Sequence, residues 1–134
     1  MATFLAKILI REGKEAAFEE TARMMWEATH ANEPSCRRYE YWRGAQPRFY
    51  YCMESFTDYV SFMEHQMSDH HEAPDFGSMI EQIELEWVDP IQGAAHLAPT
   101  VHQGLPADAS DFMRQKAKGH EMVVQEWWKA LGLI

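Results

Sequence analysis

The sequence predicts an α+β fold of the ferredoxin-like type, in which helices cover one face of a four-stranded antiparallel sheet. Three observations carry this prediction: a β-prone apolar run over residues 3–10, a helical pattern over 13–32, and two aromatic runs followed later by an alternating run over 80–88. With a further helix expected between the last two, the order is βαββαβ. A chain of 134 residues has the length of one domain and can bury a core without disulfide or metal staples.

The first strand and the first helix are justified by their apolar spacing. Over residues 3–10, Phe4 and Ile8 fall on one face and Leu5 and Leu9 on the other, so this strand is expected to be covered on both sides. Over residues 13–32 the spacing predicts a helix with one buried stripe, and a proline at position 34 follows it. The stripe consists of Phe18, Ala22, Met25, Trp26 and Thr29.

Two β-prone runs, 36–43 and 48–54, flank a Gly/Pro-containing loop and predict a hairpin. A tight loop would set Tyr41 opposite Tyr50 and Trp42 opposite Phe49, with aromatic pairs on both sheet faces. In the same register Cys52 lies opposite Tyr39. Cys36 is then three positions away from Cys52, too far for a bridge, and both cysteines are expected to be free thiols.

A second helix is predicted through about residue 66, with Ser55 or Thr57 as its N-cap. Ser68 resembles a new N-cap for a short helix running toward residue 78, with a break expected at Pro74.

The last strand is predicted from the alternation over residues 80–88. Ile83, Leu85 and Trp87 alternate with polar residues, which is typical of a strand buried on one face, and Asp89 and Pro90 end it.

The domain prediction is therefore a ferredoxin-fold domain over residues 1–90, followed by an extended connector and a C-terminal helix over 91–134. Asp108 or Ser110 is expected to cap that helix. Its apolar positions are Phe112, Val123, Val124, Trp127, Trp128 and Leu131. Two adjacent tryptophans should not remain in water, so this arm is expected to pack across its own domain or across a partner subunit.

The sheet face opposite the helices is expected to need a cover. Apolar residues of the first strand and aromatic residues of the hairpin would expose too large an apolar patch for a monomer. A second copy, packed sheet to sheet about a two-fold axis, would cover it and give a homodimeric α+β barrel.

The charge of the chain limits the kinds of partner that it is expected to bind. A formal net charge of −9 and a pI of about 5.2 argue against nucleic acid and against an anionic membrane surface. The start of the sequence has no basic region before its short apolar run, and no stretch approaches the ~18 to 20 apolar residues of a membrane span. We therefore expect a cytoplasmic protein.

The segment 65–71 is predicted to carry the chemistry, because it holds three histidines beside the aromatic strands. Imidazole transfers protons near neutral pH, so His65, His70 and His71 indicate a small-molecule pocket. The alternative for His70 and His71 is a solvated or capping role after Ser68. A metal site is not expected, because ligands at i and i+5 across a helix break do not share one helix face.

Glu54 and several aromatic residues complete the predicted site. A carboxylate in an aromatic strand needs a partner, so Glu54 either orients an imidazole or pairs with Arg37 or Arg43. The aromatic residues either hold a ligand ring or pack the core. Those chosen as substrate-binding candidates are Tyr39, Tyr41, Tyr51 and Trp87, with His71 beside them.

Three short motifs give a family resemblance that covers about residues 3–89. They are Glu33-Pro34-Ser35-Cys36-Arg37-Arg38-Tyr39-Glu40, Glu54-Ser55-Phe56 and His65-Gln66-Met67-Ser68-Asp69-His70. The last is similar to an H-x-x-S-x-H pattern. Together with the element order, they resemble the antibiotic biosynthesis monooxygenase (ABM) superfamily of dimeric α+β barrels.

The resemblance implies an activity as well as a fold. Members of that superfamily include small oxygenases that act on electron-rich phenols and quinols without metal or flavin. This implies a cofactor-independent monooxygenase in which His65 or His70 removes a phenolic proton while Tyr39, Tyr41 and Trp87 hold the ring. The residues matching haem-degrading members are not found, since His65 occupies the second-helix segment, so no cofactor is expected.

Two other functions fit the same residues. One is a non-catalytic small-molecule-binding or assembly module with structural histidines. The other is an isomerase or lyase that uses the same imidazoles without oxygen.

Overall fold

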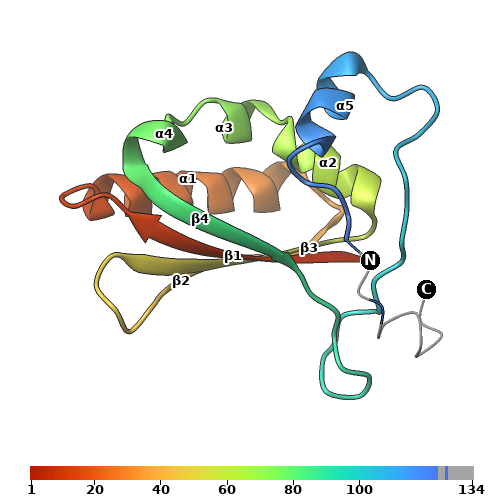
Figure 1. The fold of residues 1–134 in the computed structure, drawn as a ribbon, viewed down its shortest axis with the longest axis horizontal. Helices are drawn as coiled ribbons and strands as arrows, with labels where there is room; N and C mark the ends of the chain where they lie inside the picture. The colour runs from red at the N-terminus through yellow and green to blue at the C-terminus, as the bar shows by residue number, and fades with distance from the viewer. Residues whose placement is uncertain (124–125, 127–134) are drawn as a thin grey trace.

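The computed structural model describes residues 1–123 and 126, and it shows helices on one side of a single sheet (Figure 1). Within these residues the strands are Ala2–Ile10 (β1), Cys36–Arg43 (β2), Phe49–Phe56 (β3) and Ile80–Trp87 (β4). The helices are Glu15–Asn32 (α1), Tyr59–Gln66 (α2), Asp69–Glu72 (α3), Phe76–Met79 (α4) and Asp111–Ala117 (α5). The sheet is antiparallel with strand order β2-β3-β1-β4. This confirms the ferredoxin-like α+β fold.

Helix α1 begins after Gly13, whose φ of +77° suits glycine, and it buries one stripe against the sheet. The buried residues are Phe18, Thr21, Ala22, Met25 and Thr29. The prediction that Trp26 belongs to this stripe is wrong, because its side chain is 46% exposed. It lies on the flank of the helix, where its ring packs beside His30 with centroids 4.6 Å apart.

The β2–β3 hairpin forms, but the predicted register is wrong by two residues. Tyr41 lies opposite Cys52 and Trp42 opposite Tyr51, rather than opposite Tyr50 and Phe49. The connection is wider than assumed, and it includes Arg48 at a positive φ of 66°. A shift of two positions preserves the side-chain alternation, so every face assignment in the hairpin survives. Both cysteines are free thiols, as predicted.

Helix α2 is capped by Asp58, and neither Ser55 nor Thr57 has that role. The Asp58 carboxylate accepts from the Ser61 N–H at 2.8 Å. Ser55 belongs instead to β3, where its hydroxyl bonds that of Thr3 at 2.9 Å. Ser68 is the N-cap of α3 by position, and α3 ends at Glu72, before the predicted break at Pro74.

Strand β4 lies at one edge of the sheet, and this position changes its burial. Trp87 is buried, but Ile83 and Leu85 are 45% and 41% exposed. The expectation that all three are buried within one chain is therefore wrong. Their side chains do point to the helical side, opposite Ile8 and Ala6 of β1, but an edge strand lies beyond the cover of α1.

The segment after β4 returns to the helical layer and ends in α5, next to α2 (Figure 1). The predicted cap Ser110 is confirmed, since its Oγ accepts from the Met113 N–H at 3.1 Å. Met113 and Ala117 join a core cluster that contains Phe62 and Trp87. Of the predicted apolar positions, Val124, Trp127, Trp128 and Leu131 lie outside the described residues.

The open face of the sheet is apolar along its centre and charged at its edges. Leu5 and Met53 are half-buried on the two central strands, while Trp42 is exposed on β2. Glu84 and Glu86 are exposed on the opposite edge, on the polar face of β4 that the alternation predicts. Among the described residues, no helix is long and apolar enough to cross a lipid bilayer.

Candidate functional site

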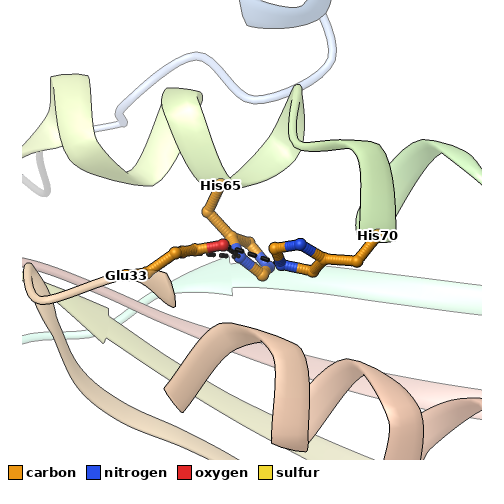
Figure 2. Close-up of side chains that lie close together, drawn as sticks. All are labelled: Glu33, His65 and His70. Carbon is orange, nitrogen blue, oxygen red and sulfur yellow. Dashed lines mark hydrogen bonds and ion pairs between the residues drawn. The ribbon is translucent and has the colours of Figure 1, made fainter. Parts of the chain in front are cut away.

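Three side chains from separate elements converge between α1 and the α2–α3 segment: Glu33, His65 and His70 (Figure 2). Glu33 is the C-cap of α1, His65 lies in the last turn of α2, and His70 belongs to α3. His65 Nδ1 lies 3.0 Å from both carboxylate oxygens of Glu33. His70 Nε2 lies 2.8 Å from Oε1 of the same carboxylate. One carboxylate therefore bridges two imidazoles.

Local chain geometry brings these groups together. Helix α1 ends just before Pro34, which turns the chain toward β2 and leaves Glu33 at the junction. Helix α2 ends one residue after His65, and the Ser68 hydroxyl donates to the His65 carbonyl at 2.8 Å. That bond holds the turn between α2 and α3. As a result His70, five residues along the chain, returns to the same carboxylate.

His65 is the most buried member of the cluster, with 1% of the residue exposed. Its ring packs against Tyr39 and Phe56, with centroids 4.7 and 5.0 Å away. A carboxylate only accepts hydrogen bonds, so the ring proton of neutral His65 belongs on Nδ1, facing Glu33. The Nε2 atom then carries a lone pair, and it is buried with no hydrogen-bond partner among the described residues.

A cleft of about 670 Å³ reaches the cluster from the surface. Glu33, His65 and His70 all line it, together with the acidic residues Glu64 and Asp69. The cleft therefore carries negative charge, and it is the route by which solvent or a ligand approaches the three side chains.

His71 is held neutral on the inner side of the cluster. Burial lowers its pKa to about 3, and the proximity of His65 and Lys116 acts in the same direction. Its ring lies 5.1 Å from that of His65, and its buried Nδ1 has no hydrogen-bond partner among the described residues. Two buried imidazole nitrogens, His65 Nε2 and His71 Nδ1, thus have no hydrogen-bond partner in the part of the chain that the structure describes.

Glu54 is also buried nearby, but its contacts differ from both predicted alternatives. Cys52 Sγ donates to it at 3.7 Å and Gln66 Nε2 at 3.4 Å. Burial raises its pKa, and the proximity of His65 opposes that rise. It hydrogen-bonds no imidazole, while Arg37 donates to backbone carbonyls and Arg43 pairs with Glu19. Glu54 is thus paired with uncharged groups.

The carboxylate that does orient an imidazole is Glu33, which sequence reasoning did not select. Glu33 is the first residue of the first family-like motif, and this was the one feature of the sequence that could have indicated its role. Its partners lie 32 and 37 residues further along the chain, so no local spacing could connect them.

The structure does not bring all of the predicted substrate-binding aromatic residues together. Tyr39 and Tyr41 lie on the helical side of the sheet near His65, and their hydroxyls are 2.9 Å apart. Burial raises the pKa of both phenols well above the usual value. Tyr51 lies on the open sheet face, and Trp87 lies in the core cluster near α5, where Nε1 donates to the Glu121 carbonyl at 2.9 Å. Of these four residues, only Tyr39 has a ring contact with a histidine, at 4.7 Å from His65.

A second cleft, of about 440 Å³, lies between α1 and the hairpin. It is lined by the exposed rings of Trp26 and Trp42 and by the buried rings of Phe18 and Tyr50. Sequence reasoning did not anticipate it, because two of these rings were assigned to core packing or to the sheet.

The fold and the His–Glu–His cluster define a small α+β protein with a buried polar site. The model of the family described as Antibiotic biosynthesis monooxygenase (ABM) matches residues 1–73, more than half of the chain. The protein belongs to this family. No curated protein sequence matches the chain.

Solved structures show the same fold. A candidate antibiotic biosynthesis monooxygenase of Caulobacter crescentus is 21% identical, with a TM-score of 0.62 over 67% of this chain and 89% of that one. A similarly described protein of Bacteroides thetaiotaomicron is 17% identical, with a TM-score of 0.63 over 77% and 95%. A protein of Shewanella oneidensis is 25% identical, with a TM-score of 0.60 over 65% and 87%.

Proposed function

We propose that this protein is a cofactor-independent monooxygenase that acts on a small phenol or quinol, with His65 as the proton acceptor. Family membership supports the reaction class. The observation that carries the assignment is the asymmetry of His65: Nδ1 is held by Glu33 at 3.0 Å, while Nε2 is buried and unpartnered. A carboxylate that fixes the tautomer and stabilises the imidazolium is the usual way to prepare a histidine base.

The proposed reaction is balanced without an external reductant. The substrate hydroxyl gives its proton to His65 Nε2, and the resulting anion transfers electrons to dioxygen. For a quinol, one oxygen atom bonds to a ring carbon, the other leaves as water, and the product is a hydroxyquinone. The substrate supplies all four electrons. General-base catalysis of this kind contributes about 10² to 10⁴ in rate.

His70 is proposed to connect the buried base with solvent. It shares Oε1 of Glu33 and lines the cleft, so a proton on His65 can pass through the carboxylate to His70 and then to water. On the inner side, Tyr39 and Phe56 pack against His65. Because Nε2 is fully covered, substrate access requires a movement of these or neighbouring side chains.

Oxygen uptake with a panel of hydroquinones and naphthols tests the proposal. His65→Ala should lose about 10² to 10⁴ in kcat/KM on an accepted substrate, and Glu33→Gln should lose less. His102→Ala is the matched control, since this histidine is exposed on the connector. Wild-type turnover by His65→Ala would refute the assignment.

Two other outcomes would replace the proposal with a different function. Product formation without oxygen would identify an isomerase or lyase. Ligand binding measured by tryptophan quenching, with no turnover of any bound compound, would identify a binding module.

We further propose that the open face of the sheet pairs with a second copy of the chain. Support comes from its apolar centre, which includes Leu5 and Met53, and from the exposed Trp42 beside it. Sedimentation should give a dimer at micromolar concentration, and Met53→Lys should shift it toward monomer. Met24→Lys is the control, because Met24 is exposed on α1, away from that face. A monomeric wild-type protein would contradict the proposal.

A further inference from the structure

We infer that Glu33, His65 and His70 form a binding site for a divalent transition-metal ion such as Zn²⁺. Each residue offers one ligand atom, and these three atoms all lie within 4.8 Å of one another. Two imidazole nitrogens and one carboxylate oxygen are a donor set that Zn²⁺ and neighbouring divalent metals accept. The spacing of His65 and His70 argues against a metal helix. The structure adds a third ligand, Glu33 at the end of α1, which the spacing of the two histidines could not reveal.

The distances within the cluster suit coordination. A metal bonded to nitrogen and oxygen at about 2.1 Å places neighbouring ligand atoms about 3.0 to 3.4 Å apart. In the structure, His65 Nδ1 is 3.0 Å and His70 Nε2 is 2.8 Å from the Glu33 oxygens. The two imidazole nitrogens lie within 4.8 Å of each other, so binding needs a movement of the two rings toward a common ion. Three protein ligands leave a coordination position for water.

Charge and access favour a cation at this place. The cleft that leads to the cluster is lined by Glu64 and Asp69 in addition to Glu33, and the whole chain carries a formal charge of −9. His70 is partly exposed to this cleft, so an ion can reach the site from solvent. Thr29 and Ser68 place hydroxyl oxygens 3.3 and 3.1 Å from His70 Nε2, where they can bond a metal-bound water.

Metal binding has a consequence for the proposed function, and this second part rests on that function. A metal on Nδ1 of His65 moves the ring proton to Nε2. It also withdraws Glu33 from the hydrogen bond that orients the ring. The nitrogen proposed as proton acceptor is then protonated. Zn²⁺ should therefore inhibit the monooxygenase, and removing the metal should restore activity.

Metal binding is tested first, without any activity measurement. Tag-free protein, treated with a chelator and then freed of it, is titrated with Zn²⁺ in competition with a chromophoric chelator. One equivalent should bind. Glu33→Gln and His70→Asn, both close in volume to the native residues, should weaken binding by at least about tenfold, because even supporting groups contribute that much. Far-UV circular dichroism verifies that the variants are folded.

The controls separate this site from other histidines. His96 and His102 are exposed on the connector, so the double variant His96→Ala/His102→Ala should bind Zn²⁺ like wild type. Failure of wild type to compete for Zn²⁺ would overturn the site. So would wild-type affinity in both ligand variants, or loss of binding in the connector variant.

Oxygen uptake tests inhibition separately. One equivalent of Zn²⁺ should abolish turnover in wild type. Unchanged or increased turnover in Zn²⁺-loaded protein would refute the inhibition while leaving the measured metal site in place. A metal-free protein that turns over no quinol would instead contradict the proposed function, and the binding titration would stand.

Discussion

Replacing Phe62 with alanine should remove a large part of the stability of the domain. Phe62 is 0% exposed, and its ring packs against Trp87, Phe4 and His120, with centroids 5.0, 5.3 and 5.7 Å away. Truncating a fully buried phenylalanine costs about 3 to 5 kcal/mol, because transfer energy is lost and a cavity remains. Domains of this size have unfolding free energies of about 5 to 15 kcal/mol. The variant should fold but be markedly less stable.

Urea denaturation at 25 °C, followed by tryptophan fluorescence and circular dichroism, measures the effect. With an m-value of about 2 kcal/mol/M, the midpoint should fall by roughly 2 M at unchanged slope. Phe112→Ala is the matched control: Phe112 is exposed on α5, so its loss should cost less than about 1 kcal/mol. Equal losses in the two variants, or a loss below about 1 kcal/mol for Phe62→Ala, would refute the described packing.

Three further changes have defined outcomes. Burial raises the pKa of Glu54. The stabilising contribution of the Glu54 carboxyl is therefore fully present at low pH and is lost as pH rises through the folded-state pKa. Glu54→Gln should raise Tm at pH 8, with the gain fading by pH 4 in a melting series. Asp58→Ala removes the α2 cap and should cost about 1 kcal/mol in urea titrations, whereas Asp58→Asn should retain most of the stability. Trp87→Phe keeps an aromatic ring but loses the bond to the Glu121 carbonyl, so limited proteolysis should cut near residue 121 faster than in wild type, and an unchanged rate would contradict that tether.

Alternation and helical spacing were sufficient to predict the fold. In the hairpin, Tyr39 and Tyr41 were assigned to one face together with Cys52, and the structure places them so. The register was wrong by two because loop length is not encoded in alternation. A shift of one residue would have moved every side chain to the other face, whereas a shift of two moves none.

The site could be predicted only in part. His65 and His70 lie within six residues of each other, in a motif that a single segment can display. Glu33 reaches them through the packing of α1 against α3, which no local pattern describes. For Trp87, the strand and the face were predicted correctly. Its position along β4 nevertheless places it away from the histidines, so it does not belong to the site. Burial of Ile83 and Leu85 also depended on sheet order, which places β4 at an edge.

The C-terminal extension is anchored to the domain in part through its own main chain. Tyr59 Oη donates to the His120 carbonyl at 3.1 Å, and Trp87 Nε1 donates to the Glu121 carbonyl at 2.9 Å. Every residue type carries a carbonyl, so substitutions at positions 120 and 121 leave both acceptors intact. The side chains that these two hydrogen bonds require are those of Tyr59 and Trp87, which belong to the domain. These two hydrogen bonds therefore place no demand on residue type at positions 120 and 121, and related chains with similar tails should be recognisable by the tyrosine and tryptophan that donate to them.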